Sequence, residues 1–119
     1  MTYMTCPPQK LWHDLGRTWM LVLIDVLREE KKGFNELQEI GISSKVLADR
    51  LQTLEDHGLV KKRLYEQDSV QRSEYSLTQK AADLFALLDA YKEFARKYDE
   101  SLLCGDISCS KCPYIMQKQ

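Results

Sequence analysis

The sequence lacks any apolar run that is long enough to cross a lipid bilayer. Its longest uninterrupted run extends only from Trp19 to Ile24, whereas a membrane-spanning helix needs about 20 apolar residues. The first residues, Met-Thr-Tyr-Met, show neither the basic start nor the apolar stretch of a signal peptide. These two absences predict a cytoplasmic protein that does not enter a membrane.

Catalytic motifs and an excess of one charge are also missing. The chain has no serine–histidine–aspartate order, no phosphate-binding glycine loop and no paired-carboxylate motif, and its two histidines have no evident partner. We therefore do not expect an enzyme. The formal net charge of −1 argues against a wholly basic nucleic-acid binder, but it is compatible with a local basic face.

What is present fits one small globular domain. The chain has 119 residues, of which 44% are apolar, so a hydrophobic core can form. Prolines favour a helix start after Cys6, and Gly16 ends that helix. The apolar stretch from Trp19 to Leu27 predicts a central helix, and a two-turn helix is expected from Phe34 to Ile40.

The stretch from Gly41 to Arg63 predicts a recognition helix. Ser43 or Ser44 can cap its first turn. Leucines recur behind the cap at the spacing of one buried helical stripe, namely Leu47, Leu51 and Leu54. Gly58 can adopt a positive φ and so ends the helix. Small polar and basic residues at the exposed start of such a helix fit the major groove of DNA.

A β-hairpin is predicted directly after this helix. Residues 59–65 form a first strand with a basic middle, residues 70–77 alternate as a second strand, and residues 66–69 are a loop by composition. Helices followed by such a hairpin form a winged helix-turn-helix. The expected fold class is therefore mainly α with a small β-wing (α+β), extended by a long C-terminal dimerisation helix.

The C-terminal part predicts a single helix that is capped by Thr78 and runs to about Leu103. Its apolar residues follow an a/d heptad spacing: Leu77, Ala81, Leu84, Leu88, Tyr91, Ala95, Tyr98 and Leu102. An amphipathic helix packed on its own domain is the competing interpretation, but the heptad row extends past what so small a domain can cover. We expect a homodimer, with residues 1–103 as the DNA-binding and dimerisation domain and residues 104–119 as a cysteine-containing tail.

The order of these motifs resembles the HxlR family of winged helix-turn-helix regulators, which are relatives of the MarR group. The matching motifs are Cys6-Pro7, Gly16-Arg-Thr-Trp19, Gly41-Ile-Ser-Ser-Lys-Val-Leu-Ala-Asp-Arg-Leu, Leu59-Val and Glu74-Tyr-Ser-Leu-Thr78. The resemblance implies a dimeric, DNA-binding transcription regulator. It also implies that Cys6 senses oxidants or electrophiles, as the matching cysteine does in several members. The three cysteines of the tail are not a usual feature of the family.

Candidate DNA contacts lie on the exposed face of the predicted recognition helix and on the wing. Serine hydroxyls and helix N–H groups donate to phosphate oxygens, and lysine or glutamine side chains reach base edges. The predicted set is Ser43, Ser44, Lys45, Ala48, Asp49, Arg50, Gln52, Lys61, Lys62 and Arg72. Arg50 either contacts phosphate or pairs with a carboxylate. Residues 43–73 hold six basic and five acidic side chains, so a merely solvated charged surface is the competing interpretation.

Four cysteines in a cytoplasmic chain indicate redox or metal chemistry more than structural disulfides. Cys6 lies near a helix N-terminus, whose partial positive charge favours the reactive thiolate; the alternative is an inert cysteine. In the tail, the x4 and x2 spacing of Cys104, Cys109 and Cys112 suits zinc or an iron–sulfur cluster, with Cys6 as a candidate fourth ligand. A dithiol–disulfide pair of Cys109 and Cys112, or three inert thiols, are the other interpretations.

Together these features predict a sequence-specific DNA-binding transcription regulator. It is expected to bind a pseudo-palindromic operator in double-stranded DNA as a homodimer, with half-sites roughly 34 Å apart. The redox or metal state of the cysteines is expected to control binding. The alternative, suggested by the near-zero net charge, is a winged-helix protein-interaction module with a zinc- or cluster-binding tail and no DNA contact.

Overall fold

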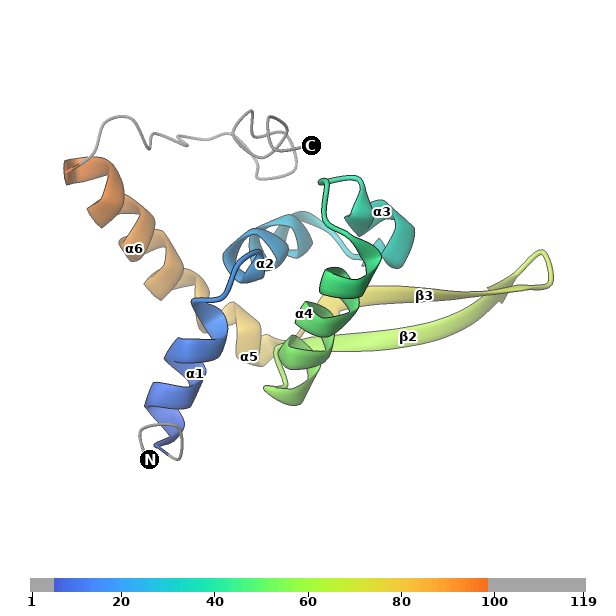
Figure 1. Ribbon diagram of the computed structural model, residues 1–119, viewed down its shortest axis with the longest axis horizontal. Coiled ribbons are helices and arrows are strands. Elements are labelled where there is room, and N and C mark those ends of the chain that lie inside the picture. Colours follow the sequence, from blue (N-terminus) through green and yellow to red (C-terminus); the bar gives the residue numbers. More distant parts are fainter. Residues whose placement is uncertain (1–5, 99–119) are drawn as a thin grey trace.

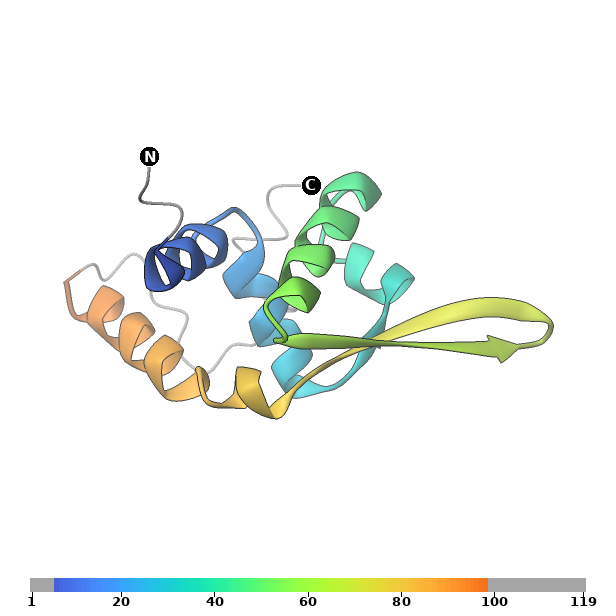
Figure 2. The ribbon, with the colours of Figure 1, turned by 90° about the horizontal axis from the view of Figure 1, so that it is seen from below.

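The computed structural model describes residues 6–98, and it confirms the expected class (Figure 1). Its elements are α1 (Pro7–Leu15), α2 (Met20–Glu29), β1 (Lys32–Gly33), α3 (Phe34–Gln38), α4 (Ser44–Asp56), β2 (Val60–Gln67), β3 (Val70–Leu77), α5 (Gln79–Ala82) and α6 (Phe85–Tyr98). Helices α2, α3 and α4 form a helical body. The β2–β3 hairpin projects from one side of this body, and α1 and α6 lie toward the other side (Figures 1 and 2).

The first two helices begin and end where the sequence predicts. A proline occupies the first position of α1, and Gly16 is its C-cap. The next helix, α2, is the centre of the domain, with six buried residues out of ten: Met20, Leu23, Ile24, Asp25, Val26 and Leu27. Its N-cap, Trp19, has a φ of 79°, an uncommon left-handed conformation for a bulky residue. The chain therefore turns sharply between α1 and α2.

The recognition helix α4 has the predicted cap, stripe and end. The Ser43 hydroxyl accepts a hydrogen bond from the backbone N–H of Val46 at 3.3 Å. The three stripe residues, Leu47, Leu51 and Leu54, are at most 1% exposed. Gly58 follows the helix with a φ of 73°, the conformation that glycine adopts without strain. The spacing of the leucines thus fixes which face of α4 points toward solvent.

The wing is longer than predicted, because its turn is shorter. Strands β2 and β3 pair antiparallel from Val60↔Leu77 out to Gln67↔Val70, and β1 adds a third strand beside β3. The expected four-residue loop at 66–69 is wrong. Asp68 and Ser69 alone make the turn, with φ values of 55° and 65°, as a two-residue type I′ turn requires.

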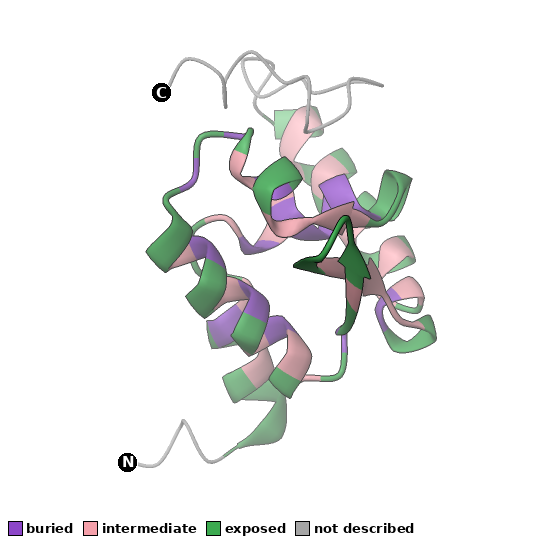
Figure 3. Cartoon of the chain, turned by 90° about the vertical axis from the view of Figure 1, so that its right-hand side faces the viewer, coloured by how far each residue is buried: buried purple, intermediate pink, exposed green. Residues whose placement is uncertain are grey.

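Only the base of the wing belongs to the core. Leu59, Val60 and Tyr75 are at most 4% exposed and pack with the leucines of α4. Toward the tip, the hairpin is exposed, as the strands that point at the viewer in Figure 3 show. The outer wing therefore has no packing role in one protomer and is available for contact with another molecule.

The C-terminal part differs from the single helix that the sequence predicts. Thr78 does cap α5, by accepting from the Ala81 N–H at 3.3 Å. However, α5 ends at Ala82, and the Leu84 N–H donates to the Ala81 carbonyl at 2.9 Å, an i→i−3 bond that tightens the turn before α6. The expected continuous helix is therefore wrong within the described residues, and Leu102 and Leu103 lie outside them.

The predicted heptad row also divides, but farther along, between Leu88 and Tyr91 of α6. Ala81 is fully buried, and Leu77, Leu84 and Leu88 pack partly buried against the core of their own domain. Packing on the same domain, the competing interpretation, is thus correct for this first half. Farther along, the exposed apolar residues of α6 are Leu87, Tyr91, Phe94 and Tyr98, from 52% to 70% exposed. Within residues 6–98, no helix is long and apolar enough to span a bilayer.

Candidate nucleic-acid interface

The start of α4 presents free donors to solvent. Ser43, Ser44 and Lys45 are all exposed. Ser43 uses its hydroxyl to cap the helix, whereas Lys45 makes no hydrogen bond or ion pair with any other residue of the range 6–98. The first N–H groups of a helix have no intrahelical acceptor and carry a partial positive charge. This end of α4 can therefore bind a phosphate or another anion.

The exposed face of α4 continues along Ala48, Asp49 and Gln52. The Gln52 amide donates to Asp56 at 2.9 Å on the next turn, so it must exchange this partner before it can reach a base. Ala48 leaves room for close approach. Five predicted contact residues within α4 are thus exposed, namely Ser44, Lys45, Ala48, Asp49 and Gln52, and their contact with DNA stays a prediction.

The side chain of Arg50 is partly buried and is held by other residues of the protein. Its Nε donates to the Thr18 carbonyl at 2.9 Å, and Nη1 donates to Asp49 at 2.5 Å. Its side chain is only 14% exposed. Arg17 approaches the same Asp49 carboxylate at 3.4 Å. Of the two roles expected for Arg50, the structure shows pairing with a carboxylate, and contact with phosphate stays a prediction.

The basic run on the wing does not form one cluster. Successive residues of a strand point to opposite faces, so Lys61 and Lys62 diverge. Lys62 lies over the Tyr75 ring at 5.9 Å. Arg63 lies over the Tyr65 ring at 4.9 Å and pairs with Glu74 at 3.1 Å.

The wing cations without a described partner are therefore Lys61 and Arg72. Both are exposed. Arg72 is the cross-strand partner of Tyr65, and both line a shallow groove between the hairpin and the start of α3. The wing accordingly offers fewer available positive charges than its sequence contains.

A polar link that the sequence did not reveal joins α1 to the end of α4. His57 Nε2 lies 2.6 Å from Asp14 Oδ2, and Lys10 Nζ donates to the same atom at 3.0 Å. Burial raises the pKa of Asp14, but the hydrogen bonds from His57 and Lys10 outweigh it and leave the pKa below its usual value. Lys80 also donates to the His57 carbonyl at 2.7 Å. The C-terminal end of α4 is therefore fixed to α1 and α5.

A second set of polar contacts holds α6 against α2. Both terminal nitrogens of the Arg28 guanidinium donate hydrogen bonds to the Asp89 carboxylate, at 2.7 and 3.0 Å. These hydrogen bonds lower the pKa of Asp89. Arg28 also lies 4.2 Å from the centre of the Phe85 ring. One turn away, Lys92 pairs with the buried Asp25. No sequence pattern pointed to these pairs, because their members are 61 and 67 residues apart.

Of the four cysteines, the structure describes only Cys6. Cys6 is exposed, carries a free thiol and is the N-cap of α1, as the prolines predicted. The predicted metal ligands Cys104, Cys109 and Cys112 lie outside the described residues. Among residues 6–98, there is no group of three or more side chains that could hold a metal ion. Metal binding by the tail stays a prediction.

The capped helix that follows α3, together with the hairpin beside it, defines a winged helix-turn-helix protein. A family model described as "HxlR-like helix-turn-helix" matches residues 14–102, and the chain belongs to this family. The chain is 32% identical to the HTH-type transcriptional regulator YodB of Bacillus subtilis over 109 residues, which are 89% of this chain and 94% of YodB. It is therefore a DNA-binding transcription regulator, as the resemblance implied.

Solved structures agree with this assignment. The reduced form of YodB from B. subtilis superposes with a TM-score of 0.71 at 31% identity, covering 85% of this chain and 98% of YodB. The redox regulator HypR in its reduced form superposes with a TM-score of 0.67 at 29% identity, covering 76% of this chain and 91% of HypR. Both the sequence and the fold thus match regulators that include proteins described by their redox state.

Proposed function

We propose that this chain is a homodimeric, sequence-specific regulator that binds a pseudo-palindromic operator and responds to oxidation of its cysteines. The observation that carries the proposal is the exposed start of α4, where Lys45 has no partner within residues 6–98 and helix N–H groups face solvent. A single helix start reads few base pairs. Two copies of α4 in successive major grooves, roughly 34 Å apart, supply the remaining affinity and specificity.

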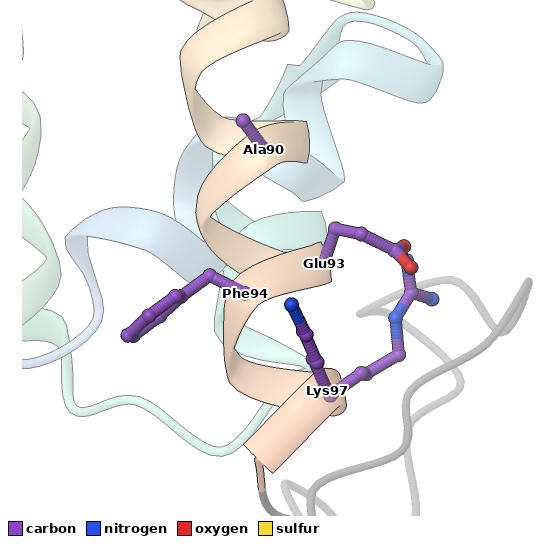
Figure 4. Close-up of a pocket in the computed structure, with 5 residues that line it drawn as sticks. Ala90, Glu93, Phe94 and Lys97 are labelled. Carbon is purple, nitrogen blue, oxygen red and sulfur yellow. The ribbon is translucent and has the colours of Figure 1, made fainter.

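The apolar row on α6 supports pairing of two copies. Leu87, Tyr91, Phe94 and Tyr98 recur at i, i+4, i+7 and i+11, so they share one side of the helix. None of the residues of α6 is buried, and a row of large exposed apolar side chains marks an interface. Phe94 projects away from α6, in a direction that differs from that of Glu93 (Figure 4), and is 63% exposed.

The shallow pocket whose lining residues are drawn in Figure 4 is not a ligand cavity. It is lined by Ala90, Glu93, Phe94, Arg96 and Lys97, all of which belong to α6. A depression bounded by one helix encloses no small molecule, whereas small-molecule sites are concave and lined from several sides. This surface is better suited to a second protomer.

A selection from random-sequence duplexes tests the proposal. We expect the parent protein to enrich an inverted repeat. Lys45→Ala should weaken binding to the enriched duplex by about 1–3 kcal/mol if Lys45 contacts a base, and Arg72→Ala should reduce affinity and the salt dependence of binding. Lys31→Ala, which removes the same charge from the exposed turn between α2 and β1, is the matched control. The absence of any enriched sequence, or unchanged binding by the Lys45 and Arg72 variants, would contradict the proposal.

Control by cysteine oxidation is supported by the relatives and by the position of Cys6. One neighbour is described as a redox regulator, with separate reduced and oxidised structures, and Cys6 is an exposed free thiol at a helix start. We expect diamide to change the affinity of the parent for its operator. Cys6→Ser should remove most of this change, and replacement of all four cysteines should remove it completely. A cysteine-free variant that responds like the parent would contradict the proposed control.

Zinc or an iron–sulfur cluster at the tail is the alternative route of control. Elemental analysis of protein purified under reducing, oxygen-free conditions distinguishes the two routes. Stoichiometric zinc or iron that is lost from a Cys104→Ser, Cys109→Ser, Cys112→Ser variant would favour the metal. The other class of function, a protein-interaction module without DNA contact, has no support from the relatives, which are transcription regulators.

A further inference from the structure

The exposed face of α4 carries an acidic residue where a DNA-binding surface would be expected to be basic. Asp49 lies on the side of the helix directly opposite the buried leucines, two residues after Leu47 and two before Leu51. Its side chain is 53% exposed. An unpaired carboxylate at this place would repel the phosphates of DNA, because phosphate contact dominates the affinity of such proteins. The presence of a carboxylate at the centre of this face therefore needs a structural explanation.

Two guanidinium groups neutralise and orient this carboxylate. Arg50 Nη1 donates to Asp49 Oδ2 at 2.5 Å, and Arg17 Nη2 lies 3.4 Å from the same oxygen. Arg50 is itself fixed, because its Nε donates to the Thr18 carbonyl at 2.9 Å. The three charged side chains sum to one positive charge, so the group as a whole attracts DNA even though it contains an acid.

The second carboxylate oxygen remains available. Within residues 6–98, no hydrogen bond uses Oδ1 of Asp49. Lys45 lies one turn before Asp49 and Gln52 lies three residues after it, so these side chains share the same face. The free oxygen is thus an oriented hydrogen-bond acceptor at the centre of the surface that faces the major groove.

The chemistry of base edges decides what this acceptor can read. In the major groove, guanine presents two acceptors and thymine presents an acceptor and a methyl group, and these repel or ignore a carboxylate. Adenine presents an amine, but an acceptor lies directly beside it. Cytosine presents the N4 amine with no neighbouring acceptor, and aspartate is a natural partner for it.

On these grounds we infer that Asp49 reads a cytosine in each half-site, with Oδ1 accepting a hydrogen bond from the cytosine N4 amine. Arg17 and Arg50 are positioning residues that hold the carboxylate and offset its charge. Arg17 belongs to the turn between α1 and α2, so this turn takes part in setting base preference. The inference rests on the proposed function, because it needs α4 to enter the major groove.

The test repeats the selection from random duplexes with parent, Asp49→Ala, Arg17→Ala and Glu55→Ala proteins. We expect one cytosine per half-site that the parent prefers by about five- to tenfold, the lower range of a base contact. Asp49→Ala should lose the preference at that one position and keep it elsewhere. Arg17→Ala should weaken the preference for this cytosine when it is introduced into the parent. It should cause no further change in that preference when it is combined with Asp49→Ala.

Glu55→Ala is the matched control, because it removes an acid from the same helix with no guanidinium beside it in the described residues. It should raise affinity slightly for all sequences and leave every preference unchanged. As a second measurement, the preferred cytosine is replaced by a pyrimidinone nucleoside that lacks the N4 amine. The parent should bind this duplex about five- to tenfold more weakly than the unmodified one, and Asp49→Ala should not distinguish the two duplexes.

The outcomes separate this inference from the proposed function. If the parent enriches an operator but Asp49→Ala keeps every preference of the parent, or behaves like Glu55→Ala, Asp49 is only a charge balance for the arginines and the inference is wrong. If the parent loses no affinity for the pyrimidinone duplex, the inference is also wrong. If the parent enriches no sequence at all, the proposed function fails first.

Discussion

The helical body and α6 differ in how completely their apolar side chains are buried. In the body, each of α2, α3 and α4 places apolar side chains in the core, including Met20, Leu37 and Leu51 at no more than 1% exposed. In α6, by contrast, no residue is fully buried. Phe85 and Leu88 pack partly buried against the core, and ion pairs with α2 also hold the helix. Apolar burial stabilises the body as a unit. Another apolar row of α6 is exposed, namely Leu87, Tyr91, Phe94 and Tyr98.

This contrast has a consequence for how the protein works. Removal of apolar area from water is the largest favourable term in folding, whereas exposed ion pairs contribute little and are screened by salt. The body that presents α4 should therefore keep its shape when α6 moves. In the proposed homodimer, such a movement would change the distance between the two copies of α4 without unfolding either one.

The largest effect is expected from a cavity in the body. Leu51→Ala should lower the free energy of unfolding by about 2–5 kcal/mol, because it removes a fully buried side chain and leaves a void. Leu64→Ala is the matched control, since Leu64 is 55% exposed on the wing, and it should change stability by no more than about 0.5 kcal/mol. Urea unfolding followed by circular dichroism measures both. Equal losses of unfolding free energy in Leu51→Ala and Leu64→Ala would contradict the claim that burial in the body supplies most of the stability.

A smaller effect is expected where α1 is fixed to the end of α4. Asp14→Asn should lower the free energy of unfolding at neutral pH by about 1–3 kcal/mol, since it weakens hydrogen bonds from His57 and Lys10 to a buried charge. The folded pKa of Asp14 lies below its usual value of 3.8. Its stabilisation is therefore present above that value and is lost as the pH falls through the folded pKa.

The measurement for this prediction is a series of urea unfolding curves at different pH values. The difference between parent and Asp14→Asn should stay constant near neutral pH and shrink as the pH falls below about 5. Asp83→Asn, an exposed acid in the turn after α5 with no partner among residues 6–98, is the control and should show no such change. A difference that grows on acidification would contradict the role given to Asp14.

The smallest effect is expected at the junction of α2 and α6. Arg28→Gln removes the two hydrogen bonds to Asp89 and the contact with the Phe85 ring. It should lower the urea midpoint less than either variant above, and the difference should shrink at high salt because the pair is exposed. A loss as large as that of Leu51→Ala, or one that salt leaves unchanged, would show that α6 belongs to the body.

Most of the body could be predicted from the sequence, because each of its signals is local. Ser43, Gly58 and the leucine spacing of α4 define a helix, its ends and its buried side within a few turns. The C-terminal part could not be predicted in this way. The turn after Ala82 interrupts the helix, and within α6 the heptad row passes from Leu88, which packs on the core, to the exposed Tyr91 and Tyr98. No glycine or proline marks that turn.

The site was predictable only in part, for a similar reason. The exposed residues of α4 follow directly from its buried stripe. The contacts that orient them join distant segments: Arg50 meets Thr18 across 32 residues, and His57 meets Asp14 across 43. Spacing along one helix carries no information about such partners, so only the folded chain reveals that Arg17 stands beside Asp49.

The most direct test of the account is the stoichiometry and footprint of the protein on its selected duplex. Analytical ultracentrifugation of the parent with this duplex should give two protomers per DNA, and hydroxyl-radical footprinting should show two protected regions about 34 Å apart on one side of the helix. Phe94→Asp, which places a charge in the apolar row of α6, should bind as a single protomer with much lower affinity. One protomer of the parent on one protected region would contradict the account.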